Sequence, residues 1–186
     1  MTPTITHIKD LVERCRHGEQ RAQMEIYDRY YKAMYNTAFR ITGHSAEAED
    51  AMQEAFLSAF TKIDSFNETS TFGAWLKRIV VNESLTAYRK MDRLGEVSYN
   101  DELKHEADHD GVVLDENDEN SARVKKILNG IKSLKENYRL GLTLHLIEGY
   151  DYEEICEIMN ISYANCRTMI SRAKESLRKK LEHHEK

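Results

Sequence analysis

The sequence has no apolar run long enough to cross a bilayer. Its longest uncharged apolar stretch is LGLTLHLI, whereas a transmembrane helix needs about 20 such residues. The opening residues, MTPTITHIKD, contain no basic segment followed by an apolar one, so no secretion signal is expected. Cysteine is scarce, with 3 residues and no CxxC pair. That scarcity excludes a disulfide framework and favours a reducing, cytoplasmic location.

Motifs of catalysis and metal binding are also missing. No glycine-rich phosphate loop, HExxH or GxSxG segment occurs. His105 and His109 lie four positions apart, but no Cys or third His is near them, so solvated side chains are favoured over a metal site. A helical-bundle metal enzyme would need inward Glu and Glu-x-x-His ligands, which these segments do not supply. We therefore expect no enzyme, no cofactor and no metal.

Helical periodicity dominates what is present, and no alternating run indicates a strand. Apolar residues recur at three- and four-residue spacing in successive segments: 8–15, 21–41, 48–60, 72–80, 124–131, 140–147 and the C-terminal stretch. Ser45 is the expected N-cap of the third of these helices. The sequence therefore predicts an all-α fold.

Charge is distributed unevenly along the chain. The formal net charge is −5, but Asp and Glu are concentrated in residues 92–120, which lack periodicity and have the composition of a flexible linker. We therefore predict two small helical domains, residues 1–91 and 121–186, joined by this acidic linker. Because the field at a surface depends on local charge, the acidic total does not exclude DNA binding by the more basic C-terminal end.

The last third of the chain has the pattern of a helix–turn–helix. Asp151 with Glu154 predicts a capping box, Asn160 suits a left-handed turn, and Ser162 would cap the second helix. Polar side chains that can bond base edges or phosphates would face outward from the second helix: Asn165, Arg167, Thr168, Ser171, Arg172 and Lys174. A DNA-reading helix is favoured over the alternative, a solvated amphipathic helix.

Two N-terminal segments have surfaces whose function cannot be decided from composition alone. In SAEAEDAMQEAFLSAF, residues 45–60, the outward face is acidic and includes Leu57, which fits either a solvated face or a protein-docking surface. In FGAWLKRIVVNESLTAYRK, residues 72–90, basic and aromatic residues are interleaved, which suits single-stranded DNA. Trp75 itself is interpreted as core. The polar loop over 64–71 could contact an unstacked base.

With these segments placed, the chain resembles an extracytoplasmic-function (ECF) sigma factor of the bacterial sigma-70 family. The resemblance rests on several motifs in the family's order: YDRYYKAMYNTAFRITG, AEDAMQEAFLSAF, FGAWLKRIVVNESL, YRLGLTLHLIEGYDYEEICEIMNIS and SRAKESLRKKL. It implies sigma region two in residues 20–91 and sigma region four in 125–181. It also implies an alternative sigma factor, a cytoplasmic protein that binds core RNA polymerase and directs promoter-specific initiation.

The resemblance further implies roles for individual residues. The helix matching 48–60 would dock on the clamp helices of the largest polymerase subunit through Asp50, Gln53, Glu54 and Leu57. The single-stranded −10 element would be recognised and melted by Asn67, Lys77, Arg78, Asn82 and Arg89. The helix–turn–helix would read the double-stranded −35 element through the outward residues of its second helix. An anti-sigma factor is an expected partner, and no membrane insertion is expected.

One position of the second helix departs from the family's usual pattern. Met169 stands where an Arg is common, which predicts the loss of a phosphate or base contact and a different −35 preference. The alternative function is a two-domain helix–turn–helix regulator that acts without polymerase docking. It would bind a discrete operator by itself, but the linker contains no dimerising heptad and the DAMQEAF segment is unexplained by it.

Overall fold

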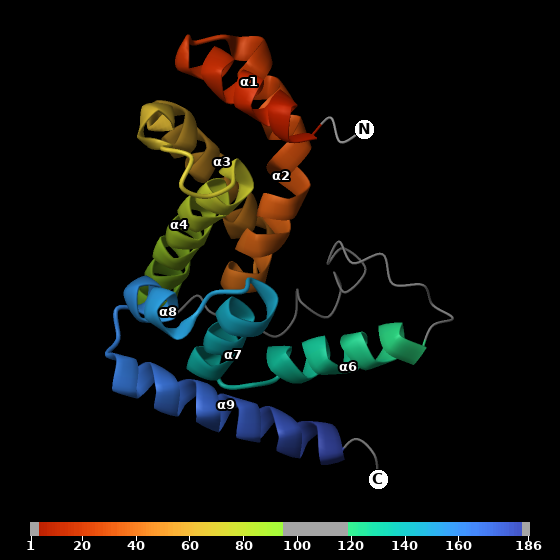
Figure 1. Ribbon diagram of the computed structural model, residues 1–186. Helices are drawn as coiled ribbons and strands as arrows, with labels where there is room; N and C mark the ends of the chain where they lie inside the picture. The colour runs from red at the N-terminus through yellow and green to blue at the C-terminus, as the bar shows by residue number, and fades with distance from the viewer. Residues whose placement is uncertain (1–3, 95–118, 184–186) are drawn as a thin grey trace. The chain divides into compact units, whose positions relative to one another are not determined.

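The computed structural model describes residues 4–94 and 119–183. The chain divides into two compact units, Met1–Gly111 and Val112–Lys186 (Figure 1). The regular elements in the described ranges are helical, with no strand among them, so the predicted all-α fold is confirmed. None of the described helices is long and apolar enough to cross a membrane. Most of the predicted acidic linker, with His105 and His109, lies outside the described residues.

The N-terminal unit is a small helical bundle. Its elements are α1 (Thr4–Arg16), α2 (Gln20–Thr42), α3 (Ser45–Thr61), the 3-10 turn η1 (Ile63–Ser65) and α4 (Phe72–Leu94). Helices α2, α3 and α4 pack against one another, and α1 packs on α2 and η1 (Figure 1). Ile26, Ala55 and Leu76 are fully buried where they meet. The predicted helical stripes therefore form one core in this unit.

The junction between α2 and α3 differs in one detail from the expectation. Gly43 adopts a left-handed conformation (φ 74°), as a residue that ends a helix commonly does. The first backbone hydrogen bond of α3 runs from the Ala48 amide to the His44 carbonyl, at 2.9 Å. His44 is therefore the N-cap, and the prediction of Ser45 is wrong by one residue. The Thr42 hydroxyl, which donates to the Ala38 carbonyl at 3.0 Å, helps to close the end of α2.

The C-terminal unit is built around one long helix. Its elements are α6 (Glu119–Lys132), α7 (Glu136–Leu142), the π-helical turn η2 (Thr143–Ile147), α8 (Tyr152–Met159) and α9 (Tyr163–His183). Helices α6, α7 and α8 all pack against α9 (Figure 1). Leu142, Leu144, Ile155 and Ile170 are fully buried at its centre. The apolar side of α9 thus organises the whole unit.

The helix–turn–helix has the predicted local signals. The Asp151 carboxylate accepts from the Glu154 amide at 2.8 Å, and the Glu154 carboxylate accepts from the Asp151 amide at 2.9 Å. Asn160 ends α8 in the left-handed conformation, with φ 54°. The Ser162 hydroxyl accepts from the Asn165 amide at 3.3 Å, at the start of α9. The capping box, the turn residue and the second cap are all confirmed.

Removing the capping box should loosen α8. We expect Asp151→Ala to reduce the free energy of local opening at α8 by about 1 kcal/mol, because an orphan amide loses its acceptor. Amide hydrogen exchange on the full chain measures this. Glu153→Ala is the matched control, since Glu153 is an exposed acid in the same first turn, and it should change the value by less than about 0.5 kcal/mol. Equal effects of the two substitutions would contradict the capping role.

Candidate nucleic-acid interface

Helix α9 presents a polar face because its opposite side is firmly packed. Cys166, Ile170 and Ala173 are fully buried. The polar residues predicted to face outward are all exposed on the other side of the helix: Asn165, Arg167, Thr168, Ser171, Arg172 and Lys174. Because the core holds one side of the helix, the polar side chains of the other side can reach into the major groove of DNA. Helix α9 therefore has the form of a recognition helix.

Two of these polar residues have partners within the unit. The Thr168 hydroxyl donates to the Ala164 carbonyl at 2.9 Å, so its proton is used by the helix itself. The Lys174 ammonium lies 3.4 Å from Nε2 of His145, a residue of η2. The His145 Nδ1 lies 3.0 Å from the Tyr150 carbonyl, which can only accept. Nδ1 therefore carries the proton, and Nε2 is left to accept from Lys174.

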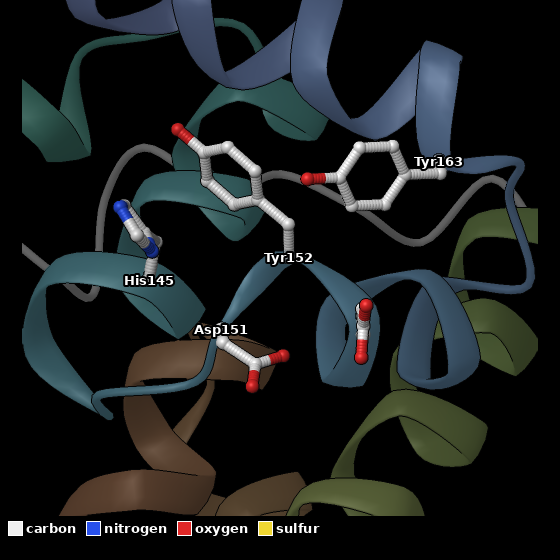
Figure 2. Close-up of a pocket in the computed structure, with 5 residues that line it drawn as sticks. His145, Asp151, Tyr152 and Tyr163 are labelled. Atoms are coloured by element: carbon white, nitrogen blue, oxygen red, sulfur yellow. The ribbon is translucent and has the colours of Figure 1, made fainter.

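A hollow of about 440 Å³ lies beside the start of α9 (Figure 2). It is lined by His145, Asp151, Tyr152, Glu153 and Tyr163. The His145 and Tyr152 rings have centroids 5.0 Å apart, and the Tyr152 and Tyr163 rings meet edge-on at 6.3 Å. Sequence reasoning missed this aromatic row, since it depends on the π-helical turn. The exposed Tyr163, at the first position of a capped helix, was the one local signal for it.

Met169 does not lie on the outward face of α9. A Cβ placed on Gly141 of α7 would lie 2.8 Å from Met169 Cε and 3.1 Å from Ile170 Cδ1. Met169 is half-buried and fills the space that the missing side chain of Gly141 leaves. The loss of a DNA contact and a different −35 preference stay predictions. The structure adds that Met169 packs against α7.

Of the two cysteines of the helix–turn–helix, Cys166 belongs to the core and Cys156 is half-buried. Cys156 and Cys166 are both free thiols, on α8 and α9. Burial raises the pKa of the Cys166 thiol to about 11, and the adjacent Cys156 thiol contributes to the same shift. Cys166 is therefore protonated at neutral pH and behaves as a small apolar side chain. Among residues 4–94 and 119–183, no cluster of His, Cys, Asp and Glu could hold a metal ion.

The predicted docking residues share one face of α3. Asp50, Gln53, Glu54 and Leu57 are spaced by three and four positions, and all are exposed. Leu57 is 62% exposed, an unusual position for a leucine. Directly behind it, Phe56 is buried against Tyr27 of α2, with ring centroids 4.8 Å apart. The exposed face of α3 thus lies over an aromatic contact between α3 and α2.

The α2 surface contains exposed apolar residues that the sequence reasoning did not select. Met24 is 59% exposed and Tyr31 is 46% exposed. Tyr31 stacks on Tyr27, with centroids 5.8 Å apart, and Tyr27 in turn contacts Phe56 of α3. The three- and four-residue spacing of Met24, Tyr27 and Tyr31 is visible in the sequence, but these side chains were interpreted as part of the buried stripe of a bundle.

The residues predicted for the −10 element are placed in different environments. Asn82 and Arg89 are exposed on α4, whereas Lys77 and Arg78 are half-buried there. The side-chain oxygen Oδ1 of Asn67 accepts from the Thr69 backbone amide at 3.3 Å and from the Thr69 hydroxyl at 2.8 Å. The side chain of Asn67 therefore shapes its own loop, and only its amide nitrogen is left to meet another molecule.

The loop over residues 66–71 borders a second hollow, of about 390 Å³. Its walls come from α1, α2, the loop and the start of α4, and include Val12, Tyr30 and Phe72. Phe66 is buried in a ring cluster, 5.5 Å from Phe72 and 5.3 Å from Trp75 by ring centroids. Trp75 packs against the core as predicted. Burial also raises the pKa of the Tyr30 hydroxyl.

These features define a class of protein: an all-helical DNA-binding chain with a helix–turn–helix in one unit and a separate helical bundle in the other. Comparison with family models matches residues 26–94 to Sigma-70 region 2 and residues 125–177 to Sigma-70, region 4. The chain is 33% identical to the ECF RNA polymerase sigma factor SigW of Bacillus subtilis (strain 168), over 94% of this chain and 96% of that protein. It is 34% identical to the ECF RNA polymerase sigma-E factor of Escherichia coli (strain K12), over 92% and 93% respectively.

The chain belongs to the ECF RNA polymerase sigma factors and is an alternative sigma factor. Its family is one of transcription initiation factors. Solved structures agree on the fold. CnrH in complex with the cytosolic domain of CnrY matches with a TM-score of 0.55 at 23% identity, covering 93% of this chain and 96% of that one. RpoE in complex with the anti-sigma factor NepR from Bartonella quintana matches with a TM-score of 0.57 at 23% identity, covering 86% and 96%.

Proposed function

We propose that three exposed faces of this sigma factor divide promoter selection between them. The α3 face docks on the clamp helices of the largest polymerase subunit. The loop at 66–71 with α4 binds single-stranded DNA at the −10 element. The exposed face of α9 reads the −35 duplex. Polymerase performs the chemistry, and this chain, acting in the cytoplasm without a cofactor, has no catalytic role.

The observation that carries this proposal is the geometry of α9. A fully buried side of the helix holds the opposite, basic side outward, and the capped turn before it sets its direction. The arginines Arg167 and Arg172 are exposed there. Arginine bonds guanine edges and phosphates in a bidentate manner, so this face can supply both specificity and affinity. The match of residues 125–177 to Sigma-70, region 4 supports the same assignment.

The α3 face supports the docking assignment by its combination of charge and exposed Leu57. Polar groups around one exposed apolar side chain are a composition expected of a protein interface. Asn82 and Arg89 are exposed on α4 and support contact with DNA there. Lys77 and Arg78 are half-buried, so their proposed role includes holding α4 as well as meeting phosphates.

An anti-sigma factor is a proposed partner. Solved neighbours of the same fold include a sigma factor in complex with an anti-sigma factor. In this chain, Val124 and Ile127 of α6 and Leu146 of η2 are exposed apolar side chains of the C-terminal unit. They are available to a protein partner, whereas a DNA-binding surface alone would not need them.

The test is reconstitution. Purified chain is added to core polymerase of its host with host genomic DNA, and the transcripts are sequenced. Starts that share −10 and −35 elements and disappear without the chain are expected. The rival regulator would instead protect a discrete operator from nuclease without polymerase. That footprint, together with no new transcript, would overturn the proposal.

A further inference from the structure

The loop at 66–71 is held from both ends by its own side chains. Phe66 is buried in the ring cluster at one end, and the Thr71 hydroxyl accepts from the Ala74 amide at 3.2 Å at the other. Between them, Asn67 accepts two hydrogen bonds from Thr69. These contacts fix a short turn, but the turn's central residue, Glu68, has no such contact within the loop itself.

Glu68 has an unusual backbone conformation for its residue type. Its φ is 59°, in the left-handed region that favours glycine. A non-glycine residue there costs free energy and is retained when surrounding contacts determine it. The contact that Glu68 makes is with α1: its carboxylate lies 2.6 Å from the Lys9 ammonium. Lys9 lowers the pKa of Glu68 through this hydrogen bond, so the carboxylate is ionised at neutral pH.

Helix α1 makes a second bond to the same loop. The Arg16 guanidinium donates to the Phe66 carbonyl at 2.7 Å and also pairs with Glu13 at 3.0 Å. Lys9 and Arg16 are two helical turns apart on one face of α1, since they differ by seven positions. Between them, Val12 is buried and lines the hollow beside the loop. Thus α1 contacts the loop at two charged points, and Val12 lies between them in the wall of the shared hollow.

We propose that α1 is a positioning element for the −10 loop, with Lys9 and Arg16 setting the conformation in which the loop meets the promoter. This inference rests on the proposed role of the loop at the −10 element. The region 2 match begins at residue 26, after α1, so it assigns this helix nothing. The Lys9–Glu68 pair is well exposed, at 61% and 44%, and a pair of this kind contributes little to global stability. We expect the pair to affect the conformation of the loop instead, and hence how well the loop distinguishes one −10 base from another.

The competing explanation is that Lys9 contacts a phosphate directly. A charge exchange separates the two. In Lys9→Glu with Glu68→Lys, the ion pair is re-formed with its direction reversed, while any direct contact of Lys9 with phosphate becomes repulsive. If Lys9 positions the loop, the double substitution restores the promoter recognition that Lys9→Ala loses. If Lys9 contacts a phosphate directly, the double substitution reduces that recognition further.

The experiment measures the affinity of the reconstituted holoenzyme for forked promoter DNA. Two probes are compared: the −10 sequence found by transcript mapping, and the same fork with one −10 base changed. We expect Lys9→Ala to reduce the ratio of the two affinities about threefold. Lys9→Ala with Arg16→Ala should reduce it about tenfold, since a charged hydrogen bond is lost as well. The charge exchange should restore the ratio to within about twofold of the parent.

Lys62→Ala is the matched control, because Lys62 is an exposed lysine just before η1. It removes the same charge near the loop and should leave the ratio unchanged. An unchanged ratio in the Lys9→Ala, Arg16→Ala variant, or no rescue by the exchange, would overturn the positioning role. Failure of the proposed function itself would be distinct, since the parent holoenzyme would then show no preference between the two forks.

Discussion

Substituting Arg167 and Arg172 together with alanine is expected to reduce transcription from the chain's own promoter about a hundredfold. A specific bidentate contact between a side chain and a base contributes about 1–3 kcal/mol, and each tenfold change in affinity corresponds to about 1.4 kcal/mol. Both arginines are exposed on α9, whereas the helix is seated by fully buried residues such as Cys166 and Ile170. The substitutions should therefore remove contacts without unfolding the unit.

The measurement is in vitro transcription with core polymerase at several salt concentrations. Loss of phosphate contacts should also make the salt dependence of promoter binding shallower, by about one unit of slope for each contact. Arg178→Ala is a suitable control, since Arg178 is paired with Glu175 at 2.6 Å, two turns beyond Ser171. It should retain transcription to within about threefold. Normal transcription by the variant lacking Arg167 and Arg172 would show that α9 is not the −35 reader.

Combining Asp50→Ala, Gln53→Ala and Leu57→Ala should lower affinity for core polymerase by a similar factor, about a hundredfold. Alanine substitution at an interface hot spot typically costs about 2 kcal/mol or more, and Leu57 is the exposed apolar residue of this face. None of the three side chains is buried, so the bundle should remain folded. The −35 duplex should still bind the isolated sigma factor as before.

Co-purification with core polymerase and competition against the parent chain give the affinity. Asp64→Ala provides a control, because Asp64 is an exposed acid of the same unit that lies in η1 instead of α3. It should compete as well as the parent. If the triple variant also competes as well as the parent, then polymerase binds elsewhere, and the exposed α2 residues Met24 and Tyr31 become the next surface to test.

The features that sequence predicted correctly depend on residues close together in the chain. The capping box joins Asp151 to Glu154, and the left-handed turn needs only Asn160. The periodicity of α9 placed its buried and exposed sides correctly because both are properties of one helix. The resemblance to sigma factors was also visible in short motifs, and the similarity to known ECF factors over most of the chain bears it out.

The features that sequence did not predict depend on contacts between distant segments. Lys9 and Glu68 are separated by 59 positions, and no periodicity links them. The expectation for Met169 treated α9 as an isolated helix, whereas Gly141 of α7 determines where that side chain lies. The π-helical turn that brings His145 to Lys174 inserts one residue per turn, which is not apparent from the hydrophobic pattern.

The contact between Gly141 and Met169 has a consequence for how such a factor can diverge. Because Met169 occupies the space left by a residue without a side chain, a small side chain at 141 would displace the flexible end of Met169, whereas a larger one would also press on Ile170 and push α9 away from α7 unless a residue of α9 became smaller. An uncompensated change of this kind would tilt the recognition helix relative to the groove while every DNA-facing side chain stayed the same. Promoter preference can therefore change by substitution beneath the reading surface, and a paired substitution at the α7–α9 contact would preserve it.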